Sequence, residues 1–362
     1  MPKRLAYDRV LFLTTLGLVT FGLVMVFSAS ALMAAERYQS PYSFVLRQAI
    51  GAGLGLGALV LILRFDYRRL KDPGVVYFLL CVTLFLLGAV FLLDRSHNTH
   101  RWIRLGPLSL QPSEMAKPTL ILFLAFYLET RLKQINQWTT LGPILFYLAM
   151  VCGLVVAEPD LGTTVALVLI AATMLYAAGL RWRLLGAAAL ASLPPLYLLV
   201  FHVAYRRERI LAFLHPWAEA RGAAFQIVQS LIAVGSGGWG GVGLMNGRQK
   251  LFFLPEAHTD FIFAVVGEEL GWVGCTLVIA AFLVFLWRGM RIARRAPDPF
   301  ARLLAIGVTA MVVIQALINF SVVTSLVPNK GIPLPFISYG GSSLIFSLAA
   351  VGVLLNVSQH TG

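Results

Sequence analysis

The sequence predicts an all-α polytopic membrane protein, a single integral membrane domain over residues 1–362 with about ten transmembrane helices. Hydrophobic residues make up 59% of the chain and charged residues 12%, whereas soluble domains carry about 25% charged residues. Apolar runs of roughly 20 residues, the length that crosses a ~30 Å hydrocarbon core, recur along the whole chain. This composition excludes a water-soluble globule.

The expected spans are the apolar runs at residues 10–33, 43–63, 75–93, 114–130, 140–157, 161–179, 184–204, 260–287, 301–325 and 338–357. The first run is longer than the about 7 to 15 apolar residues of a signal peptide, so we expect an uncleaved anchor. Residues 94–113 and 205–259 form the two long loops, the second between the seventh and eighth spans. Loops of such length are usually functional.

Lysine and arginine residues predict the orientation. With a cytoplasmic N-terminus every internal loop is basic, as the positive-inside rule requires, and both termini lie in the cytoplasm. The two long loops then lie outside the membrane. The internal basic residues are Lys3, Arg4, Arg9, Arg64, Arg68, Arg69, Lys71, Arg131, Lys133, Arg181, Arg183, Arg288, Arg291, Arg294, Arg295 and Arg302.

The formal net charge of +13 therefore reflects topology, and we expect no nucleic-acid partner. Further basic residues fall on the external side, against the simple rule. They are Arg95, Arg101, Arg104, Lys117, Arg206, Arg207, Arg209, Arg221, Arg248, Lys250 and Lys330. Either long loops are translocated regardless of charge, or these side chains form a surface for an anionic substrate.

Two stretches of the second long loop have a pattern of their own. Residues 224–235, AFQIVQSLIAVG, place apolar residues at helical spacing but are too short to span. We expect a short helix that lies in the interface or packs within the protein. The glycine-rich residues 235–243 follow, and they suit either a flexible hinge or a close approach to a ligand.

The segment from Leu254 to Leu270, LPEAHTDFIFAVVGEEL, places Asp260 at the start of a long apolar helix, with Thr259 and Asp260 as its capping pair. A charge at the edge of a bilayer is costly unless it is paired or hydrated, so such residues mark functional sites. Glu268 and Glu269 lie deeper, and we expect them to satisfy partners within the bundle rather than to be catalytic.

Other polar residues stand at the expected helix ends. Glu114 and Lys117 share a helix face, so they either form a structural ion pair or contact substrate directly. Asp160 is placed to cap the helix that begins at Leu161. Residues 328–343, PNKGIPLPFISYGGSS, are rich in proline and glycine, and non-helical backbone at membrane depth needs cover from protein or a water-filled cavity. Residues 254–269 and 328–343 are therefore expected to wall one cleft.

The chain resembles the SEDS family (shape, elongation, division and sporulation) of bacterial cell-wall polymerases over nearly its full length. The resemblance rests on long strings: RWIRLGPLSLQPSEMAK (101–117), EPDLGTT (158–164), FLHPW (213–217), QKLFFLPEAHTDFIFAVVGEELG (249–271) and PNKGIPLPFISYGGSS. It implies ten transmembrane helices in the bacterial cytoplasmic membrane and peptidoglycan glycosyltransferase activity on lipid II at the outer face. Asp260 matches the essential acidic position of the family.

Two branches of the family compete. LPEAHTDFIF followed by GEELG, Ala257, the pair Lys330 and Gly331, and the stretches YDRVLFL and FSASA look more like the division branch, FtsW, whereas IPLPF is closer to the elongation branch, RodA. The resemblance implies a lipid-linked glycan as co-substrate and a class B penicillin-binding protein transpeptidase as partner, with other divisome or elongasome membrane proteins. A lipid II flippase or another transporter, and a scaffold for the transpeptidase, remain alternatives of different classes.

The expected chemistry joins lipid II to a glycan by deprotonating a sugar 4-hydroxyl while a pyrophosphate leaves. Asp260 is the candidate general base, or else the ligand of a divalent cation, Mg²⁺ or Mn²⁺. Basic candidates for stabilising the leaving pyrophosphate are Arg101, Arg104, Lys117, Arg206, Arg207, Arg209, Arg248, Lys250 and Lys330. Further candidates for substrate contact are Glu114, His258, Ser338 and Ser342.

Overall fold

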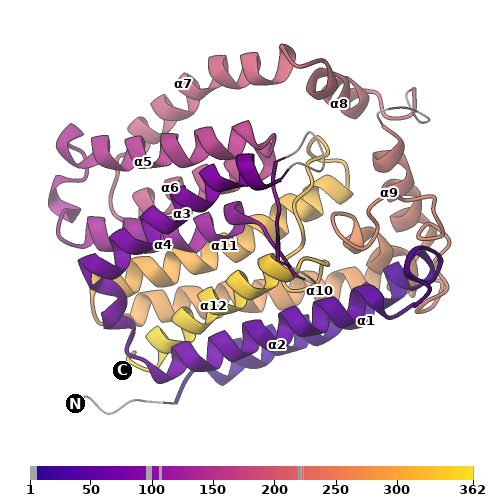
Figure 1. Cartoon of the computed structure of the whole chain (residues 1–362), viewed down its shortest axis with the longest axis horizontal. Helices are drawn as coiled ribbons and strands as arrows, with labels where there is room; N and C mark the ends of the chain where they lie inside the picture. The colour runs from indigo at the N-terminus through magenta and orange to yellow at the C-terminus, as the bar shows by residue number, and fades with distance from the viewer. Residues whose placement is uncertain are drawn as a thin grey trace.

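A computed structural model shows the chain as a bundle of long, roughly antiparallel helices (Figure 1) and describes residues 6–94, 100–105, 108–218, 220, 222 and 224–361. Ten helices coincide with the expected spans. They are α1 (Arg9–Tyr38), α2 (Ser43–Arg64), α3 (Pro73–Leu93), α4 (Pro112–Glu129), α5 (Trp138–Ala157), α6 (Leu161–Ala177), α7 (Trp182–Phe201), α10 (Ile262–Arg295), α11 (Pro299–Val323) and α12 (Gly341–Ser358), within the described part of the chain.

Seven of these helices, α1, α2, α3, α5, α10, α11 and α12, are long and apolar enough to cross a membrane, and α6 is a shorter apolar helix, among the residues described. The predicted all-α membrane fold is confirmed. The helices differ in how much of their most apolar stretch is buried within the protein. The buried share is 72% for α11 and 67% for α12, whereas it is 28% for each of α2, α3 and α10. The weakly buried helices offer apolar side chains to lipid.

α11 is the central helix of the bundle. It contacts α4, α6, α9, α10 and α12, which explains why most of its surface is buried. Small residues permit these contacts: Gly307 lies against Ile121 of α4 and Met174 of α6, and Gly289 of α10 lies against Thr309. Close approach through glycine is the usual way in which membrane helices pack. Around this centre α12 packs on α2, and α1 packs on α10.

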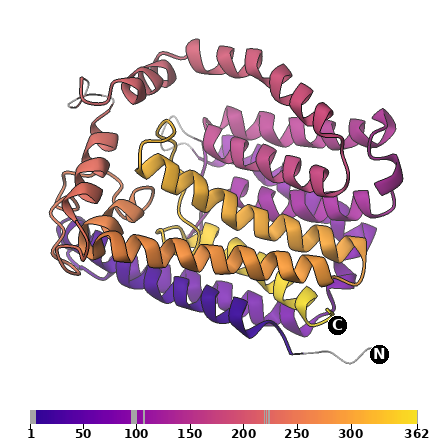
Figure 2. The same cartoon turned by 180° about the vertical axis from the view of Figure 1, so that it is seen from behind.

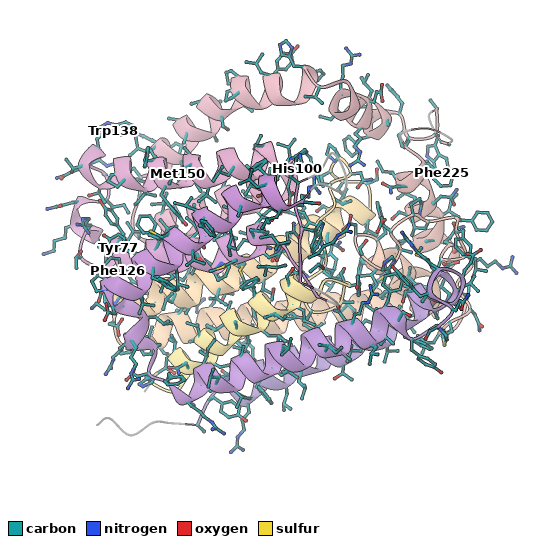
Figure 3. All side chains as sticks on the ribbon, in the orientation of Figure 1. Tyr77, His100, Phe126, Trp138, Met150 and Phe225 are labelled. Atoms are coloured by element: carbon teal, nitrogen blue, oxygen red, sulfur yellow. The ribbon has the colours of Figure 1, made fainter. Side chains whose placement is uncertain are left out.

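The start of α1 and the end of α12 lie at one end of the bundle (Figures 1 and 2), which we call the basic end. α2 ends at Arg64 and α10 ends at Arg295 there. Two short 3-10 turns, Tyr67–Lys71 and Leu132–Gln134, connect helices at this end. In Figure 3 the labelled side chains Trp138 and Phe126 lie toward this end and Phe225 toward the opposite one.

Polar contacts fasten the helices at the basic end. Asp8 accepts a hydrogen bond from the backbone N–H of Leu11 and so caps α1. Asp298 caps α11 and also accepts a hydrogen bond of 2.6 Å from the hydroxyl of Tyr67. Because side-chain acceptors satisfy the first N–H groups of a helix, these carboxylates fix where the spans begin.

The opposite end carries the irregular segments. A short antiparallel hairpin of β1 (Ile103–Leu105) and β2 (Leu108–Leu110) precedes α4. The second long loop contains two helices, α8 (Ala204–Leu214) and α9 (Phe225–Ser236). α9 is the expected short helix. It packs on α10 and α11 with Ser230 fully buried, so it packs within the protein.

The glycine-rich run after α9 packs against a break in α10. Gly271 has φ of 63° inside the helix and Gly241 has φ of 79°, and a Cβ at either would collide with backbone of the other segment. Hydrogen bonds join the segments, from Val242 N to Glu268 O at 3.0 Å and from Trp272 N to Gly238 O at 2.9 Å. The glycines therefore serve backbone-to-backbone packing, and neither the hinge nor the ligand-approach interpretation describes them.

Candidate active site

A cavity of about 380 Å³ lies at the end of the bundle opposite the basic end. Its lining comes from four parts of the chain: Arg101, Trp102, Ser109, Gln111 and Glu114; Asp160 and Thr163; Glu256, Thr259 and Asp260; and Gly331, Pro333, Tyr339, Gly340, Gly341 and Ser343. The expectation that residues 254–269 and 328–343 wall one cleft is confirmed. The hairpin and the start of α6 form the other side.

Asp260 lines this cavity just before α10. The N-cap of α10 is Phe261 and has no side-chain cap, so the prediction that Asp260 caps the helix is wrong. The side chain faces Gly331, where an added Cβ would collide with the Asp260 carboxylate. Glycine at this position lets the 328–340 segment lie directly against the carboxylate. The carboxylate thus remains a wall of the cavity instead of serving the helix.

One amide side chain holds the two walls together. Asn319 of α11 donates from Nδ2 to the backbone oxygen of Asp260 at 2.8 Å and to that of Ile332 at 2.9 Å. Asn319 is 1% exposed, so both hydrogen bonds are shielded from water. Hydrogen bonds that are shielded from water are electrostatically stronger than exposed ones, so they hold the groups they join firmly. Asn319 therefore sets the position of Asp260 relative to the opposite wall.

Four further hydrogen bonds hold the 328–343 segment in place, and one of them joins it to the opposite wall. Ser338 donates from Oγ to the backbone oxygen of Thr259 at 2.5 Å and accepts from Leu334 N at 2.8 Å. Gln48 of α2 donates to the backbone oxygen of Ser338 at 3.0 Å and accepts from the N–H of Gly340 at 3.1 Å. The hydroxyl of Ser338 is thus engaged in holding the loops, and this candidate for substrate contact acts as a positioning residue.

Burial raises the pKa of Asp260 to about 7, with further increases from the negative charges of Glu256 and Asp160, while the positive charges of Arg101 and Arg209 oppose the rise. An ordinary aspartate titrates near ~3.9. A carboxylate with a pKa close to neutrality is matched to proton abstraction at neutral pH. The site therefore combines a basic carboxylate with two nearby guanidinium groups.

Arg101 is fixed to the wall of the cavity by the end of α5. Its Nε donates to the backbone oxygen of Glu158 at 2.9 Å, and a terminal nitrogen donates to that of Pro159. Burial raises the pKa of Glu158 to about 8, and the charge of Asp160 adds to this effect. Because its hydrogen-bond partners are neutral carbonyls, the Arg101 guanidinium makes no ion pair within the described residues and can still bind an anionic group in the cavity.

Asp160 caps α6, as predicted. Its carboxylate accepts from Thr163 N at 3.0 Å and from the Thr163 hydroxyl at 2.8 Å. Gln111 donates to the same carboxylate at 3.4 Å. The cap gives Asp160 a structural role even though it lines the cavity.

The sequence left two interpretations open for Glu114 and Lys117, and the structure shows the first of them, an ion pair. Their side chains are 3% and 2% exposed and the charged atoms lie 2.7 Å apart. Glu114 reaches the cavity, whereas Lys117 is outside its lining. Lys117 thus balances Glu114, and its charge is not available to a substrate.

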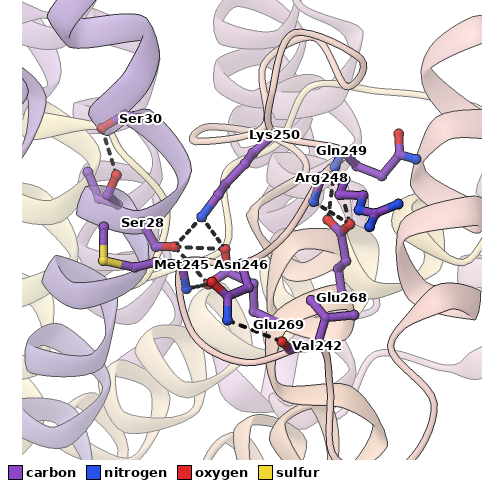
Figure 4. Close-up of polar contacts among 11 residues, drawn as sticks. Ser28, Ser30, Val242, Met245, Asn246, Arg248, Gln249, Lys250, Glu268 and Glu269 are labelled. Atoms are coloured by element: carbon purple, nitrogen blue, oxygen red, sulfur yellow. Dashed lines mark hydrogen bonds and ion pairs between the residues drawn. The ribbon is translucent and has the colours of Figure 1, made fainter.

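Lys250 likewise lies outside the cavity. It pairs with Glu269 at 2.5 Å and donates to Ser28 of α1 at 2.9 Å (Figure 4). Glu268 accepts from the backbone N–H groups of Arg248 and Gln249. The expectation of partners within the bundle is confirmed for Glu269, which accepts from Ser28 of α1, whereas the partners of Glu268 lie in the loop before α10. Lys250 therefore anchors the loop to α1 and α10, and its charge is balanced by Glu269.

The remaining candidates are distributed around the same end. Arg104 on β1, Arg207 on α8 and Arg248 are exposed, whereas Arg209 and Lys330 are half-buried. None of these five is in the cavity lining. The side chain of Arg206 falls outside the described residues, and so do Arg95 and Arg221.

His258 and Ser342 have structural neighbours. His258 is buried between the rings of Phe44, at 4.7 Å between centroids, and Tyr339, at 5.6 Å. Burial lowers the pKa of His258. The hydroxyl of Ser342 accepts from Gln111 N at 3.3 Å. Both residues support the walls of the cavity.

Sequence reasoning did not assign roles to Asn319, Gln48 or Tyr339, and it gave none to Glu256. A signal existed for the two amides, since polar side chains within membrane helices usually have a function. Within the described residues no group of three or more His, Cys, Asp or Glu side chains is placed to hold a metal ion. A cation at Asp260 would complete its coordination with water or with substrate oxygens.

A family model described as a cell cycle protein family, that of FtsW, RodA and SpoVE, matches residues 8–362. The chain belongs to this family. A relative from Geobacter metallireducens, named a probable peptidoglycan glycosyltransferase FtsW, is 46% identical over 98% of this chain and 95% of its own length. Stage V sporulation protein E of Bacillus subtilis is 42% identical over 99% of both chains.

Solved structures show the same architecture. A chain of a peptidoglycan synthase complex, studied for how polymerization and crosslinking are coordinated, is 34% identical and superposes with a TM-score of 0.81 over 99% of both chains. The rod shape determining protein RodA of Thermus thermophilus is 30% identical, with a TM-score of 0.73 over 99% of both chains. The arrangement of the helices is thus that of this family.

Replacing Lys117 by Met should lower the melting temperature of the purified protein in detergent, because it leaves Glu114 as an unpaired buried charge at a cost of ~3–5 kcal/mol. The double variant Glu114→Gln, Lys117→Met should recover most of that loss. Lys71→Met is the matched control, since it breaks an ion pair in which Lys71 is 47% exposed and should cost under ~1 kcal/mol. Equal melting of Lys117→Met and Lys71→Met would contradict a structural pair.

Proposed function

We propose that the chain is a peptidoglycan glycosyltransferase that polymerises lipid II into glycan strands in cell division, with Asp260 as its catalytic residue. The names of the relatives support the activity, and the name FtsW supports the division role. The observation that carries the assignment of the site is the cavity in which the Asp260 carboxylate and the Arg101 guanidinium meet.

Each residue then has a defined part in the reaction. Asp260 takes the proton of an acceptor sugar 4-hydroxyl as that oxygen forms a bond to the anomeric carbon of the donor. The bond from that carbon to the lipid pyrophosphate breaks, and the pyrophosphate leaves with the electron pair. A positioned base contributes ~10²- to 10⁴-fold to such a step.

The leaving pyrophosphate needs positive charge that no protein carboxylate has neutralised. Arg101 lies in the cavity wall with carbonyl partners only, and Arg209 is near enough for its charge to lower the pKa of Asp260. Arg101 is therefore the strongest candidate among the basic residues. Asp260 and Glu256 are the residues that would hold Mg²⁺ or Mn²⁺ together with substrate phosphates, and such a cation would supply further positive charge.

The partner that we propose is a class B penicillin-binding protein, which would cross-link the new strands. Support comes from the structural relative, which is part of a complex that couples polymerization and crosslinking. An alternative role as lipid II flippase would require a polar pathway along the bundle. The cavity residues instead gather at one end, which favours chemistry at that end.

The orientation that we propose puts the basic end in the cytoplasm and the cavity at the outer face of the cytoplasmic membrane, following the positive-inside rule. Starting from a variant without the native cysteines, an impermeant thiol reagent should label Glu208→Cys, which is exposed on α8, in cells stripped of their outer layers. Arg68→Cys and Arg294→Cys should label only after lysis. Labelling of Arg294→Cys in intact cells would reverse the orientation.

Asp260→Asn should abolish glycan synthesis from labelled lipid II by the purified complex, with a rate ~10²- to 10⁴-fold lower. The amide retains the size of the side chain but cannot accept the proton. Gly331→Ala should also slow the reaction, because its methyl group would displace the carboxylate. Asp66→Asn at the basic end is the control and should keep full activity. A wild-type rate for Asp260→Asn would favour the scaffold or transporter.

The rate should depend on pH through Asp260. The base works only when deprotonated, so kcat/KM should rise about tenfold per pH unit below the pKa of about 7 and level off above it. Glu256→Gln removes a negative charge that raises this pKa, so the rising limb should move to lower pH. Glu208→Gln should leave the limb in place. An unmoved limb in Glu256→Gln would exclude Asp260 as the titrating group.

A further inference from the structure

Two neighbouring hollows at the basic end are rich in arginine. The first, of about 290 Å³, lies between the start of α1 and the ends of α10 and α12, and its lining includes Asp8, Arg9 and Arg288. The second, of about 310 Å³, lies along α10 and is lined by Trp287 and three arginines. Arg291 and Arg295 line both hollows, so the two form one continuous basic surface.

The positive charge of this surface is largely unbalanced. The one carboxylate in the two linings, Asp8, already receives two hydrogen bonds from Nε of Arg288, at 3.1 and 2.9 Å, and a third from its terminal nitrogen. Within the described parts of the chain, the side chains of Arg291, Arg294 and Arg295 make no hydrogen bond or ion pair with another residue. Like charges held this close repel one another, and an anionic occupant would relieve the repulsion.

An apolar stripe leads along α10 into these arginines. Ile279, Leu283 and Trp287 are 39%, 58% and 60% exposed, and they precede Arg291 at intervals of four residues. Residues at this spacing share one helix face. In a span this face meets lipid, and tryptophan is typical of the level at which acyl chains give way to headgroups. The face thus changes from hydrocarbon contact to positive charge within about two helical turns.

We infer that this surface binds an anionic glycerophospholipid, whose phosphate lies among Arg291, Arg294 and Arg295 and whose acyl chains lie along Ile279 and Leu283. Guanidinium groups hold phosphate oxygens through paired, charge-assisted hydrogen bonds. Basic pockets between membrane helices on the cytoplasmic side are suited to such headgroups. The positive-inside rule alone accounts for basic loops, but it does not account for a hollow that continues an exposed apolar stripe.

The test measures which lipids remain bound. The full-length protein is reconstituted into nanodiscs of equal parts phosphatidylglycerol and phosphatidylcholine, extracted, and analysed by native mass spectrometry. The wild type should retain phosphatidylglycerol in preference to phosphatidylcholine. Because each arginine near an anionic lipid contributes about fivefold in affinity, Arg291→Gln with Arg295→Gln should weaken retention by about 25-fold. Arg294→Gln, at an exposed position, should weaken it by about fivefold.

The matched control is Arg181→Gln with Arg183→Gln. These residues flank the exposed Trp182 at the same end and lie outside both hollows, so their loss should leave retention unchanged. If the control lost lipid as strongly as the double variant, the effect would be general surface charge and the site would not exist. Unchanged retention in both hollow variants would overturn the proposal as well.

A second arm separates a lipid site from a site for soluble phosphate. Glycerol phosphate, which has the phosphate but no acyl chains, is added at millimolar concentration before extraction. A lipid site that uses the apolar stripe should keep its phosphatidylglycerol. Complete displacement by glycerol phosphate would show a site for soluble phosphate compounds and would contradict the proposed acyl-chain contact.

Discussion

The geometry of the site depends on the two hydrogen bonds that Asn319 donates from the centre of the bundle. Both go to backbone carbonyls of non-helical segments, those of Asp260 and Ile332. Such backbone survives at membrane depth only where protein satisfies its polar groups. α11 can deliver this amide because it is packed on nearly all sides, so the most buried helix fixes the most irregular part of the chain.

The acidic residues near the cavity end divide according to whether a partner satisfies them. Glu114 pairs with Lys117, Glu269 pairs with Lys250, and Glu268 accepts backbone N–H groups. Asp260 has no ion pair within the described residues and faces a cavity, with burial raising its pKa. A carboxylate that is paired with a cation has a lowered pKa and is a weak base. A desolvated carboxylate without a paired cation keeps a raised pKa and can accept a proton. This difference supports the proposal that Asp260 is the catalytic residue.

The break in α10 connects the catalytic segment to α1. Glu269 lies just before Gly271 and reaches both Lys250 of the loop and Ser28 of α1. The glycine run lies against the same break, so the loop before Asp260 is anchored at several points along α10. Rigid support of this kind keeps a catalytic group within the tolerance that the reaction demands. At the other end of α10, the unpaired arginines leave the helix open to contact with lipid headgroups.

The sequence by itself predicted where ten long helices lie, seven of which are long and apolar enough to cross a membrane among the described residues. The reason is that each apolar run is continuous along the chain, so its length can be read directly. The sequence also predicted the Asp160 cap and gave the Glu114–Lys117 pair as one of two interpretations, since these partners are three residues apart on one local element. The role of Asp260 followed from its position at a helix start and from the resemblance to a family.

Only the tertiary structure decided which basic residues remain for an anionic substrate and what holds Asp260 in place. Lys250 and Arg101 look alike in the sequence, yet Lys250 meets Ser28 and Glu269, and Arg101 meets carbonyls. Gln48 and Ser338 are 290 residues apart. Which residues become partners depends on how the helices pack against one another. Helical periodicity shows only which residues of one helix share a face, so it cannot identify partners on other helices. The chemistry of the site was therefore visible in the sequence, whereas its geometry arose from packing.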